Sequence, residues 1–105
     1  MDEYVWPAGP EVPAANLVRE TWEATVAALP VEARITGEVI GRQRFGVFIR
    51  IDGVANAIAL AEITAMPYGM DLPALGAFVS GKVLWHAVHS HQVKVRLDEW
   101  LAADE

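Results

Sequence analysis

The segment GRQRFGVFIR, residues 41–50, combines residue types that could bind a nucleic acid. Phe45 and Phe48 stand three apart with Gly46 between them. Residues three apart in a flat strand point to opposite faces, but a glycine admits a bulge that brings both rings onto one surface. Exposed aromatic rings stack bases, at about 1–3 kcal/mol per base. We expect Phe45 and Phe48 to form such a stacking platform; the alternative is that one or both are ordinary core residues of a strand.

The same segment carries three arginines, Arg42, Arg44 and Arg50. Guanidinium groups bind phosphate oxygens, and these contacts add affinity without reading a sequence. We expect the three arginines to hold phosphates beside the two rings.

Other chemistry has less support in the sequence. His86, His89 and His91 could offer imidazoles to zinc, copper or nickel, but the chain has no cysteine and the nearest carboxylate in sequence is Asp98. The alternative is a polar hairpin with its histidines in solvent, and we expect no metal site. No pair of carboxylates, serine context or phosphate-binding glycine loop suggests catalysis. We expect no catalytic residue, no cofactor and a protein that is not an enzyme.

Helical periodicity precedes the segment. Residues 1–13 hold three prolines without a period and predict an irregular lead-in. In residues 14–30, Val18, Trp22, Val26 and Leu29 recur every three or four positions, and Pro30 follows. This pattern predicts an N-terminal amphipathic helix. Its apolar stripe either packs on the following domain or binds a partner.

From residue 33 the period drops to two, which is typical of strands. We expect five strands, beginning near residue 34 and then over Phe45–Ile51, Ala55–Leu60, Val79–His86 and Gln92–Leu97. Five short strands with one long connection, between the third and the fourth, match a small Greek-key β-barrel of the OB type. The predicted fold class is therefore all-β, a five-stranded barrel over residues 31–98 with an added N-terminal helix, followed by an acidic tail over 99–105.

Charge is divided unevenly along the chain, whose net charge is −6. Residues 34–97 hold seven basic and four acidic side chains, whereas the flanks on either side are strongly acidic. The flanks either solubilise the protein or fold over the basic body as a mimic of nucleic acid.

The central part of the chain resembles the S1-like RNA-binding domain family. The resemblance is carried by TGEVIGRQRFGVFIRIDG, NAIALAEI, LGAFVSGKVL and KVRL, in family order over residues 34–97. It implies an OB fold that binds RNA through Phe45 and Phe48. The family also uses a histidine, an aspartate and a basic residue, whose positions fall on Ala59, near Ala87 and on Lys94. Because only the last keeps its character, the resemblance implies weak binding with little selectivity.

The expected function is a non-enzymatic module that binds single-stranded RNA. The alternative is a degenerate S1-like domain that acts as a protein-interaction or regulatory module, through its helix and acidic flanks. The N-terminus lacks the basic start and apolar run of a secretory signal, and the most apolar run is too short to span a membrane. We expect a cytoplasmic protein without a membrane partner.

Overall fold

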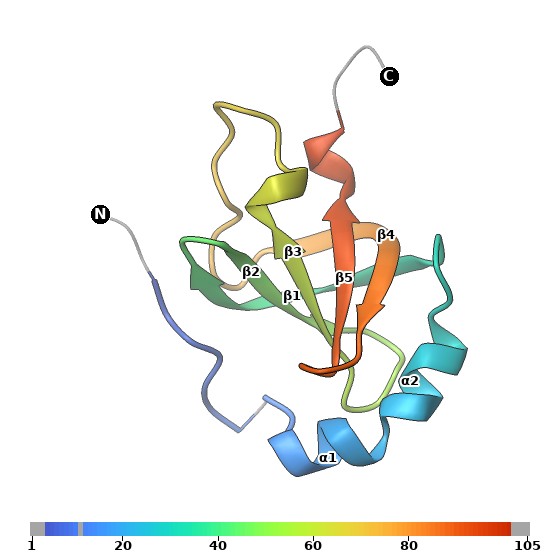
Figure 1. Cartoon of the computed structure of the whole chain (residues 1–105). Coiled ribbons are helices and arrows are strands. Elements are labelled where there is room, and N and C mark those ends of the chain that lie inside the picture. Colours follow the sequence, from blue (N-terminus) through green and yellow to red (C-terminus); the bar gives the residue numbers. More distant parts are fainter. Residues whose placement is uncertain (1–3, 11, 102–105) are drawn as a thin grey trace.

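The computed structural model describes residues 4–10 and 12–101, and its main element is a closed five-stranded β-barrel (Figure 1). The strands are β1 (Arg34–Gln43), β2 (Gly46–Ile51), β3 (Ile58–Glu62), β4 (Phe78–Ala87) and β5 (Gln92–Leu97). They follow one another around the barrel in the order β1-β2-β3-β5-β4. β3 and β5 are parallel and every other pair is antiparallel. The predicted five-stranded OB barrel is confirmed.

The core lies inside the barrel and explains the alternation in the sequence. Its least exposed side chains are branched aliphatic residues that face inward on alternate strand positions: Val39, Val47, Ile49, Val83, Val93, Val95 and Leu97. Each such side chain contributes about 1.5–3 kcal/mol when it leaves water. A short 3-10 helix, η2 (Asp98–Trp100), follows β5 and buries Trp100 to 2% exposure against this core. The predicted acidic tail therefore begins with a packed turn, and residues 102–105 lie outside the described residues.

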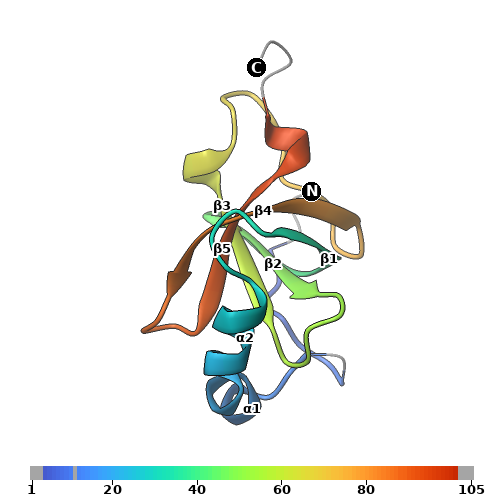
Figure 2. The ribbon, with the colours of Figure 1, turned by 90° about the vertical axis from the view of Figure 1, so that its right-hand side faces the viewer.

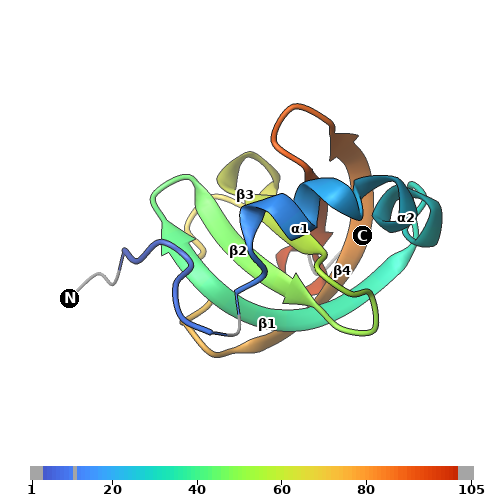
Figure 3. The same ribbon diagram turned by 90° about the horizontal axis from the view of Figure 1, so that it is seen from below.

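The predicted helix over 14–30 appears as two short helices, α1 (Ala15–Glu20) and α2 (Trp22–Ala28). The break falls at Thr21, whose hydroxyl donates to the carbonyl of Leu17 at 2.8 Å. Such a bond to the fourth preceding carbonyl bends helices. Both helices lie at one end of the barrel (Figures 2 and 3).

The apolar stripe of this helical segment packs on the protein's own barrel. Trp22 contacts the rings of His86 and His91 edge-on, with centroids 6.3 and 5.5 Å away. His86 Nε2 donates to the carbonyl of Leu29 at 2.7 Å. The β4–β5 hairpin thus uses two of its histidines to hold the helices. No group of three metal-ligating side chains occurs within residues 4–10 and 12–101.

The third strand begins later than its sequence suggested. Asp52-Gly53 indicated a short hairpin turn and a strand over Ala55–Leu60, but six residues, 52–57, join β2 to Ile58. Gly53 and Asn56 both adopt positive φ angles, +79° and +61°, within this turn. No helix in the part of the chain that the structure describes is long and apolar enough to cross a membrane.

Two glycines allow a matched test of how the β2–β3 pair is held. A Cβ at Gly46 (φ +155°) would overlap the carbonyl of Ala61, whereas one at Gly53 (φ +79°) would meet no atom within 4 Å. Gly53→Ala should lower the free energy of unfolding by about 1–2 kcal/mol, the strain of a left-handed residue. Gly46→Ala should lower it by about 3 kcal/mol or more, because β3 must also move. Urea unfolding of both variants measures the difference, and equal losses would contradict the close approach of β3 to Gly46.

Candidate nucleic-acid interface

The two phenylalanines of the platform lie on one surface. Arg44 and Phe45 form the turn between β1 and β2, so Phe45 is free of the alternation that governs strand residues. Its ring meets that of Phe48 edge-on, with the centroids 5.9 Å apart. Phe48 points out of the barrel, because Val47 and Ile49 on either side belong to the core. The hairpin therefore brings the two rings together.

A third ring covers this pair. Trp6, in the lead-in, has its centroid 6.0 Å from that of Phe45 and 5.9 Å from that of Phe48. As a result Phe48 is only 6% exposed, whereas Phe45 is 40% exposed and Trp6 60%. A base could reach Phe45 and Trp6 in this arrangement, but not the face of Phe48. The sequence shows Trp6 only as a tryptophan in a lead-in without periodicity, and it gives no signal for which rings Trp6 contacts.

The lead-in is held at this position by its neighbours. The N–H of Val5 donates to the carbonyl of Arg42, and the N–H of Arg42 to the carbonyl of Val5, both at 2.7 Å. The Tyr4 ring centroid lies 5.8 Å from Cζ of Arg42 and 5.6 Å from Cζ of Arg44, which are cation–π distances. Residues 4–6 thus add one bridge to the edge of β1 and place aromatic rings over the predicted binding residues.

The four predicted phosphate contacts differ in their availability. Arg42 Nε donates to the carbonyl of Pro73 at 3.1 Å, which holds that guanidinium inward. Arg50 pairs with Glu38 at 2.7 Å, and Lys94 pairs with Glu62 at 3.1 Å. Arg44 is exposed, and its contact among the described residues is the Tyr4 ring. Arg44 is therefore the readiest of the four to meet a phosphate.

The strand register decides which family positions face outward. Ala59 belongs to the core and is 0% exposed, so a side chain there cannot contact a ligand on the outer surface. Its neighbour Leu60 pairs with Phe48 on one side and with Lys94 on the other. The outward position beside Phe48 is thus occupied by a leucine. Ala87, near the position expected for the aspartate, is 7% exposed.

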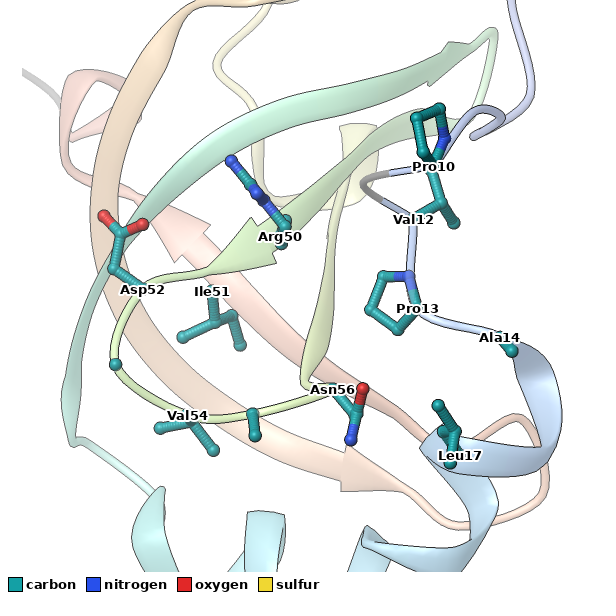
Figure 4. A pocket seen from close by; sticks show the side chains of 12 residues that line it. Pro10, Val12, Pro13, Ala14, Leu17, Arg50, Ile51, Asp52, Val54 and Asn56 are labelled. Atoms are coloured by element: carbon teal, nitrogen blue, oxygen red, sulfur yellow. The ribbon is translucent and has the colours of Figure 1, made fainter.

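A groove of about 790 Å³ lies between the lead-in and the β2–β3 turn. Figure 4 shows Pro10, Val12 and Pro13 on one side and Arg50 with the turn residues on the other. The lead-in therefore stands away from β2 here, although Trp6 anchors it farther along. Arg50 reaches the groove already paired with Glu38.

One ion pair on the β1–β4 side shifts the titration of both partners. Arg34 donates a hydrogen bond to Asp98, which raises the pKa of Arg34. The same bond, with a smaller contribution from the Ser80 hydroxyl, lowers the pKa of Asp98. The positive charge of Arg96 lowers it further. Asp98 thus stays ionised among basic neighbours.

Comparison with solved structures extends the fold assignment. The chain matches Mycoplasma genitalium RNase R in complex with ribose-methylated single-stranded RNA with a TM-score of 0.64 and 15% identity, over 78% of this chain and 15% of that one. GSP13 from Bacillus subtilis matches with a TM-score of 0.58 and 24% identity, over 73% and 62%. The fold is that of an S1-like OB domain.

A third structure, the a/eIF2α–aDim2p–rRNA complex from Pyrococcus horikoshii OT3, matches with a TM-score of 0.56 and 15% identity. That match covers 66% of this chain and 44% of the other. The chain thus spans less than two thirds of each of these three proteins. No family model and no curated protein matches the chain.

The contact between Trp6 and Phe48 can be measured by a double-mutant cycle. Phe48→Ala should lower the free energy of unfolding by about 3 kcal/mol, because its ring is almost fully covered. Trp6→Ala should cost less, and the double variant should show a coupling of about 1 kcal/mol, as expected for an aromatic pair. Phe78, 76% exposed on β4, serves as the control partner. A coupling as small as that between Trp6 and Phe78 would show that the lead-in does not dock on the hairpin.

Proposed function

We propose that this protein is a non-enzymatic module that binds single-stranded RNA. Bases stack on Phe45 and Trp6 at the tip of the β1–β2 hairpin, with Phe48 supporting both rings from beneath. Arg44 binds the adjoining phosphate, and Arg42 positions the hairpin and the lead-in. The observation that carries the proposal is an exposed aromatic pair beside an exposed arginine on an S1-like barrel.

The comparisons support the class of ligand. Two of the similar proteins were solved with RNA, RNase R with single-stranded RNA and a/eIF2α in a complex with rRNA. Stacking on aromatic rings suits every base, since each base has a π-face. We therefore infer that the ligand is a single strand bound with little regard to sequence.

The same geometry accounts for the proposed low affinity. Arg50 and Lys94 already pair with Glu38 and Glu62, so a phosphate must displace a carboxylate to reach either cation. The outward neighbour of Phe48 is Leu60, which offers no hydrogen bond to a base edge. Binding then rests on two rings and few free charges.

The alternative function, a protein-interaction module, has less support. It relied on the N-terminal helix and the acidic flanks, and the helical segment has Val18, Trp22 and Leu29 buried against the protein itself. Apart from alanines, Leu17 is the one exposed apolar residue of α1 and α2, so these helices offer a partner little apolar surface.

Replacement of Phe45 tests the proposed stacking directly. Titration of a labelled twelve-nucleotide oligouridine by fluorescence anisotropy should show binding that weakens with salt. Phe45→Ala should raise the Kd by roughly tenfold, the effect of about one stacked base. Tyr68→Ala, which removes a more exposed ring from the connection between β3 and β4, should leave the Kd unchanged. Absence of binding by the folded protein at low salt would overturn the proposed function.

Trp6→Ala separates two roles of the lead-in. If Trp6 stacks a base, as proposed, the variant should bind the same oligonucleotide several-fold more weakly. Circular dichroism of the variant should match that of the original protein, because Trp6 lies outside the barrel. Tighter binding would instead mean that Trp6 masks Phe48 and must leave before RNA can bind.

A further inference from the structure

Three cations lie side by side on the outside of the barrel, away from the β1–β2 hairpin. Arg34 of β1 is paired in register with Lys82 of β4, and Lys82 with Arg96 of β5. All three alternate with core residues and so face outward. Like charges directly opposite each other on neighbouring strands repel. A bound anion would therefore reduce the repulsion between these three cations.

Acidic residues neutralise only part of this row. Asp98 forms an ion pair with Arg34 and lies near Arg96. Neither Lys82 nor Arg96 forms an ion pair with any residue in the ranges 4–10 and 12–101. Together with Lys94, this face carries four of the eight basic residues of an acidic chain. Glu62 and Asp98 are the carboxylates paired with them, so the face keeps a positive charge.

An exposed tryptophan borders the same cations. Trp85 of β4 is 51% exposed and is paired in register with Lys94. Its ring centroid lies 5.6 Å from Nζ of Lys94. Lys94 and Arg96 are two residues apart on β5 and project from one face, so Trp85 stands beside the Lys82–Arg96 pair.

Within residues 4–10 and 12–101, the helices and the lead-in lie away from this side of the barrel. The helices α1 and α2 lie at one end of the barrel, and the lead-in follows the β1–β2 side (Figures 1 and 3). Figure 2 shows the helices below β4 and β5, with the segment that leads from α2 into β1 passing in front of these strands. Arg34 and Trp85 are exposed and Lys82 and Arg96 are half-buried, so these four side chains reach solvent on this side, whereas the Lys94 side chain is only 11% exposed.

We propose that the outer face of β4 and β5 is a second contact surface for single-stranded nucleic acid, where Trp85 stacks a base and Lys82 and Arg96 bind phosphates. The inference rests on the proposed function, because the RNA that binds at the β1–β2 hairpin would continue onto this face. The path of the RNA across β2, β3, β5 and β4 is marked by four outward residues in register: Phe48, Leu60, Lys94 and Trp85.

The spacing of this path sets the length of the ligand. Phe48 and Trp85 are separated by three steps between neighbouring strands, about 14 Å at the backbone at roughly 4.8 Å per step, and the path outside the closed barrel is longer. A strand of several nucleotides is needed to reach both ends, which falls within the site size of about 4–16 nucleotides for an OB fold. A dinucleotide would contact one surface at a time.

The four tryptophans provide a test that separates the two surfaces. In protein labelled with ¹⁵N, the indole N–H of each tryptophan gives its own signal, assigned by single replacements, while twelve-nucleotide oligouridine is added. The signals of Trp85 and Trp6 should shift with the same apparent Kd. Trp100, 2% exposed, should not shift. If the Trp6 signal shifts and the Trp85 signal does not, this inference fails while the proposed function stands.

Affinity measurements test the cations independently. Trp85→Ala should raise the Kd roughly tenfold. The variant K82Q/R96Q should reduce the slope of log K against log salt by about 1.4, the effect of two phosphate contacts on a single strand. Arg19→Gln on α1 and Tyr68→Ala in the connection between β3 and β4 are the controls for charge and for ring removal, and both should bind as the original protein does. Unchanged affinity and slope in Trp85→Ala and K82Q/R96Q would overturn the inference, and so would a complete absence of RNA binding.

Discussion

The contact of Trp6 with the rings of Phe45 and Phe48 determines what the hairpin presents to solvent. With this contact in place, Phe45 and Trp6 are exposed and Phe48 is buried. Its strength is moderate. Two hydrogen bonds at about 1 kcal/mol each, two ring contacts of similar worth and two cation–π contacts amount to about 5 kcal/mol. Ordering the backbone of residues 4–7 costs about as much, at roughly 1–2 kcal/mol per residue. The net free energy that holds the lead-in on the hairpin is therefore small, and a ligand can change it.

Ion pairs within the protein divide the basic residues into two groups. Lys94 and Arg50 are attached to carboxylates on neighbouring strands, so a phosphate replaces an existing partner there. Among the described residues, Lys82 and Arg96 have no protein carboxylate to displace, so a bound anion would replace only ions from solution. Release of ions into solution raises their entropy. Salt dependence should therefore come from Arg44, Lys82 and Arg96 more than from the residues nearest the phenylalanines. The charge of the whole chain says little about this division.

The sequence could predict the barrel because each strand obeys a local rule. Alternation identified four of the five strands within a few residues, and the family motifs supported their order. The third strand was displaced because Asp52-Gly53 is a strong signal for a short turn, yet Asn56 at φ +61° extends the turn. The register with β2 matters for the site: Ala59 pairs with Ile49 and lies in the core, whereas Leu60 pairs with Phe48. A register error of one residue exchanges the two faces of a strand.

The site was less predictable than the fold because its contacts join distant parts of the chain. Trp6 meets Phe45 across 39 positions, and no local pattern in a proline-containing lead-in indicates such a contact. The row of Arg34, Lys82 and Arg96 likewise exists only once β1, β4 and β5 are in register. Residue types in the segment 41–50 predict a binding chemistry, which stays a prediction. Which of those residues remain accessible depends on tertiary packing, since a ring that stacks on RNA stacks equally well on a neighbouring tryptophan.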